Sequence, residues 1–499
     1  NYPDSLPKKG SVDHSTAGGK LLYELFHNED NTVFEKLLAE IVGNVIISHH
    51  AYLQDYLNVN LESKYIERVR DKEIPQYNKV KSALFENVIS EENFTKYITL
   101  ATQEIERFLK SNSPEKVAEN LMFLTKYIFS TLIDADRTDS MMFEENLLDV
   151  NSENRSKLFE DYYEKLKNKL ALFEKELTEE NEIGALRKQM SQQCEDFSEK
   201  DPGVYTLSIP TGGGKTLASL RYALKHALKY GKERILYIVP YTTIIEQNAA
   251  DIRNILQDKE NILEFHSNVI EEGEEAFEDS DDDFFEDTQK LKLSKESWES
   301  PIVFTTMVQF LNVFYDNGTR SIRRLHNLSN SVIIFDEVQK VPTECVSLFN
   351  KSVNFLKEYC SSTVLLCTAT QPSLDYVENK LEINSDGEII SNLPAVVEAF
   401  KRVELFDYAT DQLFNTEKLS LFVERKVEED GSVLVVMNTR KVVKGLFISL
   451  KETMEKVYIY HLSTSMCAAN RKNILKDIRE KLNNNEKVIC VSTQLIEAG

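Results

Sequence analysis

The chain has 499 residues, of which 41% are hydrophobic and 28% are charged, and its formal net charge is −23. This composition excludes a disordered or fibrous protein, and no segment reaches the roughly 20 consecutive apolar residues that a membrane-spanning helix needs. The negative charge argues against tight non-specific binding of duplex nucleic acid. Much of it lies in residues 271–287, an acidic segment that we expect to be solvated. With no charged-then-apolar N-terminal segment, the sequence predicts a cytoplasmic protein without a membrane partner.

The first third of the chain predicts helices and no strands. Residues 1–175 carry apolar side chains three and four positions apart, as amphipathic helices do. Residues 151–182 are charged and amphipathic and contain neither Gly nor Pro, which favours a long helix that links two domains. We therefore expect a helical domain over residues 1–175, with the linker helix included.

From residue 203 onward, short apolar runs alternate with helical stretches. This alternation is typical of a parallel sheet covered by helices on both faces. The first series of apolar runs is 204–209, 235–239, 301–305, 332–335 and 363–367, and a second series is 433–437, 457–461 and 487–492. We expect a complete α/β domain over residues 176–398 and an incomplete one over residues 399–499.

A glycine-rich loop follows the first of these runs. Residues 208–216 read Ser-Ile-Pro-Thr-Gly-Gly-Gly-Lys-Thr, a loop whose backbone N–H groups can wrap a triphosphate. Lys215 would reach the outer phosphates, and the Thr216 hydroxyl would hold Mg²⁺. The predicted ATP-binding residues are Pro210, Thr211, Gly212, Gly213, Gly214, Lys215 and Thr216.

Two carboxylates end the apolar run at 332–335. Asp336 would bind the Mg²⁺ of the nucleotide, and Glu337 would orient the attacking water. The loop and the carboxylates, in this order and about 120 residues apart, predict an NTP-hydrolysing domain. Its catalytic residues would be Lys215, Asp336 and Glu337.

Small hydroxyl residues follow three other runs, in the segments 240–242, 305–306 and 368–370. The carboxyl ends of parallel strands are where open α/β sheets bind ligands, and hydroxyls there suit contacts to a sugar-phosphate backbone. A helix N-cap is the favoured interpretation of any one of these segments taken alone.

In this order the motifs resemble those of superfamily 2 helicases over residues 200–499. Segments 210–216, 240–242, 336–339 and 368–370 are similar to motifs I, Ia, II and III, and segments 438–440 and 492–499 to motifs IV and V. The resemblance implies that single-stranded DNA is contacted by Pro240, Thr242, Thr306, Thr439 and Thr493. It implies that the ATP state is coupled to the grip on the strand through Thr368, Ala369 and Thr370.

The resemblance has two departures. Ile209 stands where the family has a small residue, which leaves the loop itself intact. No segment matches motif VI, whose arginines touch the γ-phosphate in the family, so we expect the chain as it stands to hydrolyse ATP poorly. Because it begins with Asn1 and stops just after the run at 487–492, we also expect truncation at both ends.

Three histidines and an acid lie at or near the ends of the expected N-terminal helices. Asp13-His14-Ser15 opens one helix, Ser48-His49-His50 closes another, and Asp136 follows an apolar run. Such residues can converge on metal ions, although a lone helical histidine is more often an ordinary surface or core residue. His49 and His50 would point about 100° apart on a helix, so one metal could use both only with help from an irregular turn.

Fused ahead of the helicase motifs, these segments resemble the signature nuclease-helicase of type I CRISPR systems, whose N-terminal part is a metal-dependent HD nuclease. Segments 266–268, 298–306 and 461–464 are similar as well. The resemblance implies an all-α HD-type domain followed by tandem RecA-like α/β domains, the second incomplete. It implies transition-metal ligation by His14, His49, His50 and Asp136, with Asp134 supporting the ligands or capping a helix.

The metal site also departs from the family. The family's first histidine and its His-Asp pair have no counterpart, and His27 does not replace them because it follows the motif without a partner acid. We therefore expect the nuclease activity of the chain as it stands to be impaired.

The function implied by the resemblance is ATP-driven 3′ to 5′ translocation on single-stranded DNA, coupled to endonuclease cleavage of that DNA. An RNA-guided surveillance complex that has opened an R-loop would recruit the protein to invading DNA. In an alternative, the two α/β domains still form an ATP-driven translocase, here called the motor, and the helical domain is a non-catalytic docking module. A third hypothesis, an ATPase acting on proteins or small molecules, is disfavoured by the ordered helicase motifs.

Overall fold

The computed structural model describes residues 13–144, 154–175, 181–266, 297–369, 374, 377–408, 415–463 and 465–496. The chain divides into two compact units, Asn1–Lys401 and Arg402–Gly499. This division lies three residues after the expected start of the second α/β domain at residue 399. The acidic segment 271–287 and Thr370 fall outside the described residues.

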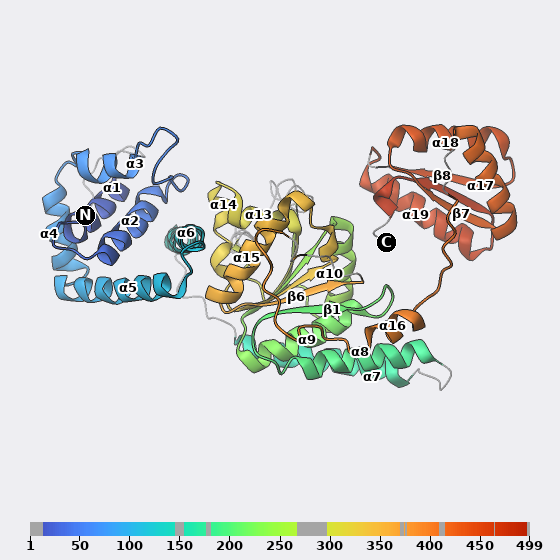
Figure 1. Cartoon of the computed structure of the whole chain (residues 1–499), viewed down its shortest axis with the longest axis horizontal. Helices are drawn as coiled ribbons and strands as arrows, with labels where there is room; N and C mark the ends of the chain where they lie inside the picture. Colours follow the sequence, from blue (N-terminus) through green and yellow to red (C-terminus); the bar gives the residue numbers. More distant parts are fainter. Residues whose placement is uncertain are drawn as a thin grey trace. The chain divides into compact units, whose positions relative to one another are not determined.

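The described residues 13–144 form a helical bundle without strands, as predicted (Figure 1). Its elements are α1 (His14–Phe26), α2 (Val33–Ser48), α3 (Lys64–Ile66) with the π-helical turn η1 (Glu67–Asp71), α4 (Tyr77–Asn87), α5 (Glu91–Ser111) and α6 (Val117–Glu144). Helix α2 starts with a capping box in which Thr32 and Glu35 bond each other's backbone N–H groups. Its apolar side packs against α1 and α5, so the residues around the end of α2 are held by both neighbours.

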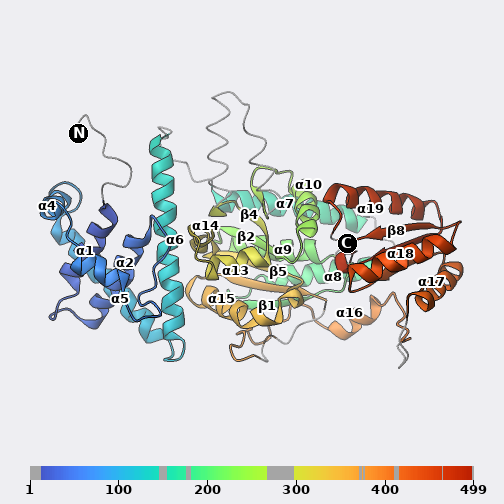
Figure 2. The same cartoon turned by 90° about the horizontal axis from the view of Figure 1, so that it is seen from above.

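Helix α6 belongs to two cores at once. On one side Leu121, Leu124 and Ile128 pack with residues of α2 and α5. On the other side Phe123 is fully buried and lies edge-on against Phe314 of the following domain. Figure 2 shows α6 standing between the bundle helices and α14 and α15. The helix therefore packs in the core of the bundle and in the core of the first α/β domain.

The first α/β domain, residues 154–401, contains a six-stranded parallel sheet in the order β1-β6-β5-β2-β4-β3. The strands are β1 (Val204–Ser208), β2 (Arg234–Val239), β3 (Ile262–Phe265), β4 (Ile302–Thr306), β5 (Ser331–Asp336) and β6 (Thr363–Thr368). Five of them coincide with the predicted apolar runs. The sequence analysis missed β3, a four-residue strand whose short apolar run is interrupted by Glu264.

Helices cover both faces of this sheet, as the alternating pattern predicts. One face packs against α7 (Arg155–Lys175), α8 (Glu182–Phe197), α9 (Lys215–Tyr230) and α10 (Thr242–Leu256). The other packs against α6, α13 (Met307–Tyr315) and α15 (Val346–Tyr359). The short elements α14 (Thr319–Ile322), η2 (Leu325–Leu328), η3 (Val338–Lys340), η4 (Thr343–Cys345) and α16 (Leu393–Ala399) complete the domain.

Helix α7 forms where a linking helix is expected, but it is built into the α/β core. Phe159, Tyr162 and Leu166 on its apolar side are fully buried in the same cluster as strand residues of the sheet. The only tryptophan, Trp298, is also fully buried, edge-on to Phe265 at 5.7 Å between ring centroids. It is therefore a core residue and is not exposed for base stacking.

The second unit contains a three-stranded parallel sheet in the order β7-β9-β8. Its elements are α17 (Thr416–Asp430), β7 (Ser432–Val436), α18 (Arg440–Thr453), β8 (Tyr458–Leu462), α19 (Ala468–Asn483), β9 (Val488–Ser492) and η5 (Gln494–Ile496). The parallel strands agree with the expected second α/β domain. Its main core is formed by Val427, Val443, Leu446, Leu450, Ile489 and Val491.

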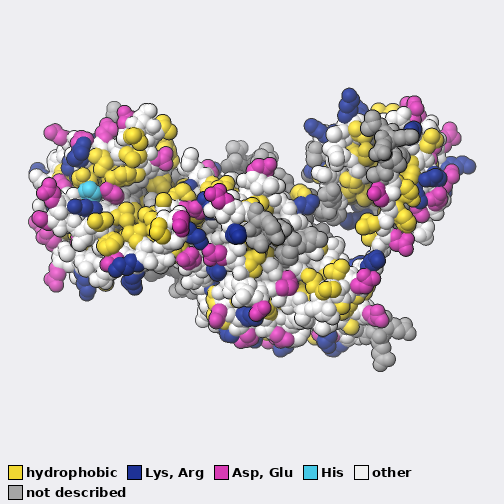
Figure 3. Space-filling view, viewed as in Figure 1, with side chains coloured by type: hydrophobic (Ala, Val, Ile, Leu, Met, Phe, Trp, Pro, Cys, Tyr) yellow, Lys and Arg dark blue, Asp and Glu magenta, His cyan; other side chains and the backbone are white. Residues whose placement is uncertain are grey.

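Within the described helices, none is long and apolar enough to cross a membrane. Acidic and basic side chains are interspersed over the visible face of the first unit (Figure 3). The large net charge is therefore not gathered into one acidic surface on this face.

The packing of α6 in both cores leads to a prediction for Phe123→Ala. Truncating this fully buried ring removes its contacts with Phe314 and with Phe355, 5.1 Å away between ring centroids. We expect a loss of about 3–5 kcal/mol, read as a lower urea midpoint of unfolding. Tyr97→Ala, at an exposed position of α5, should shift the midpoint little; equal shifts would contradict the assignment of Phe123 to the core.

Candidate functional site

The glycine-rich loop connects β1 to α9, and each of its glycines has a steric reason. Gly212 and Gly214 have φ of 78° and 86°, which residues with a side chain rarely adopt. A Cβ on Gly213 would lie 2.5 Å from Ile209 and 2.9 Å from the Pro210 carbonyl oxygen. The loop can therefore curve tightly enough to turn its N–H groups toward a phosphate at the start of α9.

A cavity of 690 Å³ opens beside this loop. Its lining comes from α7, α8, the loop, the first turns of α9, and Glu337. Arg187 of α8 reaches across it and donates from Nε and Nη2 to the Gly212 carbonyl oxygen, at 2.9 and 2.6 Å. The sequence analysis missed Arg187, because nothing in the pattern of α8 shows that it lies against the loop.

Lys215 and the two carboxylates meet at the carboxyl edge of the sheet. The Lys215 ammonium lies 2.8 Å from Asp336 Oδ1 and also contacts the Glu337 carboxylate. Although burial disfavours its charged form, the two carboxylates raise the pKa of Lys215, so the side chain stays cationic. The Glu337 backbone has φ of 54°, an uncommon conformation of the kind that clusters at functional sites.

Hydrogen bonds continue from Glu337 to the neighbouring strand. Gln339 donates through Nε2 to Glu337 Oε2, and its Oε1 accepts from the Thr368 hydroxyl, both at 2.5 Å. Thr368 is fully buried and the following Ala369 is half-buried. Glu337, Gln339 and Thr368 therefore link the end of β5 to the end of β6. Gln339 was part of the predicted motif, but the sequence did not show that it bridges Glu337 and Thr368.

The residues expected to contact DNA lie at strand ends, and several also have a structural role. Thr306 and Thr439 are the N-caps of α13 and α18, accepting from the backbone N–H of Gln309 and Val442. Pro240 is half-buried after β2, and Thr242 begins α10. Thr493 is 9% exposed after β9. Their predicted DNA contacts are not tested by this placement.

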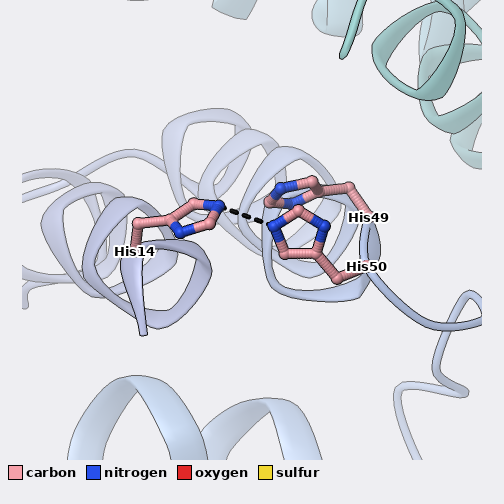
Figure 4. A group of neighbouring side chains, drawn as sticks. All are labelled: His14, His49 and His50. Atoms are coloured by element: carbon pink, nitrogen blue, oxygen red, sulfur yellow. Dashed lines mark hydrogen bonds between the residues drawn. The ribbon is translucent and has the colours of Figure 1, made fainter. Parts of the chain in front are cut away.

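The structure brings together His14, His49 and His50 on the helical bundle (Figure 4). One ring nitrogen from each lies within 4.8 Å of the others, and Nε2 of His50 is 2.6 Å from Nε2 of His14. His14 and His50 are exposed and His49 is half-buried. Burial and the neighbouring His49 and His14 rings lower the pKa of His50, with Asp136 acting in the opposite direction.

An irregular turn is what lets both neighbouring histidines face His14. Helix α2 ends at Ser48, so His49 is its C-cap and His50 lies in the following turn. Their ring centroids are only 3.8 Å apart, unlike consecutive residues within a helix. The Ile46 carbonyl accepts a 2.6 Å hydrogen bond from His49 Nδ1, which leaves Nε2 of that ring available.

Asp13 fixes the helix end that carries His14. It caps α1, accepting from the Thr16 backbone N–H at 3.1 Å, and it pairs with Arg68 and Lys72. Although burial opposes the shift, the hydrogen bonds from Lys72 and Thr16 hold its pKa well below the usual range. These contacts fix the start of the helix on which His14 is the first residue.

Two neighbouring acids of α6, Asp134 and Asp136, have different surroundings. Asp136 is half-buried and interacts electrostatically with His50, but it is not in the three-histidine group. Asp134 was expected to support the ligands or cap a helix, and the capping role is corrected. It lies inside α6 and pairs with Arg323 Nε at 2.5 Å and His326 Nε2 at 3.3 Å, both in the first α/β domain.

Known proteins are similar to this chain in sequence and in fold. Residues 187–377 match the DEAD/DEAH box helicase family. The chain is 27% identical over 279 residues to the CRISPR-associated nuclease/helicase Cas3 of Haloferax volcanii, covering 52% of this chain and 29% of that protein. A protein of the same name from Methanothermobacter thermautotrophicus is 22% identical over 505 residues, covering 95% of this chain and 54% of that protein. A crystal structure of T. fusca Cas3 matches all of this chain and 60% of its own, with a TM-score of 0.60 at 14% identity.

The parallel sheet, the glycine-rich loop and the carboxylates of β5 thus define a helicase ATP-binding domain. Together with the relatives, which share most of the chain's length, they confirm the resemblance drawn from the sequence. The chain is similar to the Cas3 nuclease/helicases and contains a DEAD/DEAH box helicase domain. It spans 54% and 60% of the relatives that match nearly all of it.

The contact between α8 and the loop generates a prediction for Arg187→Met. Removing its two hydrogen bonds to Gly212 loosens the loop, and a loss of about 1 kcal/mol corresponds to about fivefold weaker binding of a fluorescent ATP analogue. Lys167→Met is the control, because Lys167 of α7 lies near Glu164 and is not among the residues that line the cavity. Equal affinities of wild type and Arg187→Met would refute the anchoring role.

Proposed function

We propose that this chain is an ATP-dependent 3′ to 5′ translocase on single-stranded DNA, coupled to a metal-dependent endonuclease that degrades invading DNA. The observation that carries the motor is the contact of Lys215 with Asp336 and Glu337 beside the glycine-rich loop. The group of His14, His49 and His50 supports the nuclease. The relatives named nuclease/helicase support the combination.

In the motor, each residue has a role that its placement suits. The loop N–H groups and Lys215 would bind the phosphates, releasing Lys215 from its present carboxylate partners. Thr216 and Asp336 would hold Mg²⁺, which prefers oxygen ligands and neutralises charge on the phosphates. Glu337, whose pKa is lowered by Lys215 against the effect of burial, is ionised and can orient a water.

The bond from Gln339 to Thr368 would carry the state of the ATP site to the strand-contacting segments. Thr368 is the first residue of the proposed coupling segment, which continues with Ala369 and Thr370. The proposed contacts to DNA are made by Pro240, Thr242, Thr306, Thr439 and Thr493, through the sugar-phosphate backbone and without reading sequence.

This role generates a prediction for Thr368→Val. The substitution keeps the buried volume but removes the hydroxyl that donates to Gln339. We expect the basal ATPase rate to change less than twofold while stimulation by single-stranded DNA falls about tenfold, the effect of a coupling energy of ~1.4 kcal/mol. Thr363→Val, at the start of the same strand, is the control. Full stimulation in Thr368→Val would exclude the relay.

In the nuclease, the histidine group would hold transition-metal ions, which favour imidazole ligands. The donor set fits: Nε2 of His49 is available because Nδ1 bonds the Ile46 carbonyl, and the His14 and His50 nitrogens face each other. Asp136 would complete the ligands from α6. Such ions activate water for attack on a phosphodiester. The residues themselves orient the ligand atoms and hold them at the surface, where a strand has access.

A specific observation favours a second candidate for the bundle. Asp136 lies outside the histidine group, so the described ligand set has no acid. In this candidate the motor is retained and the bundle is a docking module without catalysis. In either case we propose that the protein acts in the cytoplasm and is recruited by an RNA-guided surveillance complex at an R-loop.

Cleavage of circular single-stranded DNA with Mn²⁺, Co²⁺ or Ni²⁺ separates the two candidates. We expect cutting that requires metal and is lost in the variant carrying both His49→Ala and His50→Ala. The control is His27→Ala, because His27 bonds Glu40 at 2.8 Å and lies outside the group. Lys215→Ala should cut the circle without ATPase activity. No cutting with any metal, while DNA-stimulated ATPase persists, would favour the docking module.

A further inference from the structure

The face of α6 that meets the first α/β domain is a continuous stripe at helical spacing. From one end to the other, its residues bond or pack against side chains and carbonyls of that domain: Glu119, Phe123, Lys126, Tyr127, Ser130, Asp134 and Arg137. The spacing of three and four positions keeps all of them on one side of the helix. The α/β domain therefore contacts α6 from Glu119 to Arg137.

The contact of this stripe that lies closest in the chain to Asp136 on its N-terminal side is the pair of Asp134 and Arg323. The Arg323 side chain is 2% exposed and that of Asp134 is 18% exposed, so solvent screens this pair little. The adjacent residue, Ile322, is buried in one apolar cluster with Val45 of α2 and Ile133 of α6. Val45 lies one turn before His49 on α2. The segment 322–323 therefore touches both the helix that leads to His49 and the helix that carries Asp136.

Asp136 lies two residues after Asp134 and on another side of α6. It continues the series of Leu124, Ile128 and Leu132, which faces the bundle. Asp136 interacts with His50 electrostatically yet stands outside the histidine group. Its distance from the group depends on how α6 lies against α2, and residues 322 and 323 contribute to that arrangement beside the direct packing of the two helices.

We propose that Arg323 is a positioning residue for the metal site: by holding Asp134, it sets α6 against α2 and so places Asp136 relative to His50. This inference rests on the proposed metal-binding function of the histidine group. It makes the metal site dependent on the α/β domain, because a ligand helix of the bundle is fixed by a side chain of the motor.

Arg323→Met distinguishes positioning from simple electrostatics, since the two predict opposite signs. Removing a cation near a metal site should by Coulomb's law strengthen the binding of Co²⁺. Loss of positioning should weaken it, by about 10-fold or more, as substitutions behind metal ligands usually do. The measurement is a Co²⁺ titration of the 499-residue chain without ATP, followed by the visible absorption of the bound ion.

The matched control is Lys351→Met. Lys351 pairs with Glu119 on the same stripe of α6, at 2.7 Å, but 17 residues from Asp136, about 25 Å along the helix. We expect its Co²⁺ affinity to stay within twofold of wild type. Unchanged or tighter binding by Arg323→Met overturns the proposal, and so does equal weakening by Lys351→Met, because the effect would then be general docking.

Two further measurements keep the outcomes apart. Binding of a fluorescent ATP analogue reports whether each variant is folded; if Arg323→Met fails this check, Arg323→Lys replaces it. Lysine keeps the charge without the guanidinium fork, so severalfold weaker Co²⁺ binding is expected, and wild-type affinity would overturn the proposal. If wild type shows no Co²⁺ absorption that is lost in His49→Ala, the proposed metal site itself fails, whatever Arg323 does.

Discussion

The contact of Lys215 with the carboxylates of Asp336 and Glu337 is the interaction on which the motor depends. An ammonium and two carboxylates are held together at low exposure only because β6 lies between β1 and β5 and the three strands end at one edge. Separating such charges without replacing them is costly. A nucleotide with its metal offers the replacement, with phosphates for the lysine and a cation for the carboxylates. The charges of these three side chains are therefore complementary to those of a nucleotide and its metal ion.

Helices that contribute to both parts also join the motor to the bundle. Helix α6 contributes Phe123 to the core of the α/β domain and Asp136 to the neighbourhood of the histidines. Thr306, a proposed strand contact, caps α13, and α13 leads into α14, whose Ile322 packs against the bundle. Packed helices have few alternative arrangements, so a change at the proposed strand contacts has a short physical route to the proposed metal site.

Much of this could be predicted from the sequence, for identifiable reasons. The strands of the parallel sheets are continuous apolar runs, and the loop at 208–216 has residue requirements that few other structures share. What was missed is of another kind. The sequence did not predict the hydrogen bond from Arg187 to Gly212, the bridge that Gln339 makes between Glu337 and Thr368, or the pairing of Asp134 with Arg323. These contacts join segments that are far apart in the chain or depend on a local backbone conformation. Neither residue type nor spacing encodes them. A metal ion bound by both His49 and His50 requires an irregular turn, and only the structure shows that turn.

The most direct test of the account is the affinity of a non-hydrolysable ATP analogue with and without a single-stranded oligothymidine. Binding is the right observable, because it does not depend on how fast the chain hydrolyses ATP. If the ATP site and the strand contacts are coupled, each ligand must tighten the other by the same factor, and we expect fivefold or more, the lower end of typical coupling energies. An analogue affinity that is identical with and without the oligonucleotide, at concentrations where the oligonucleotide binds, would contradict the account.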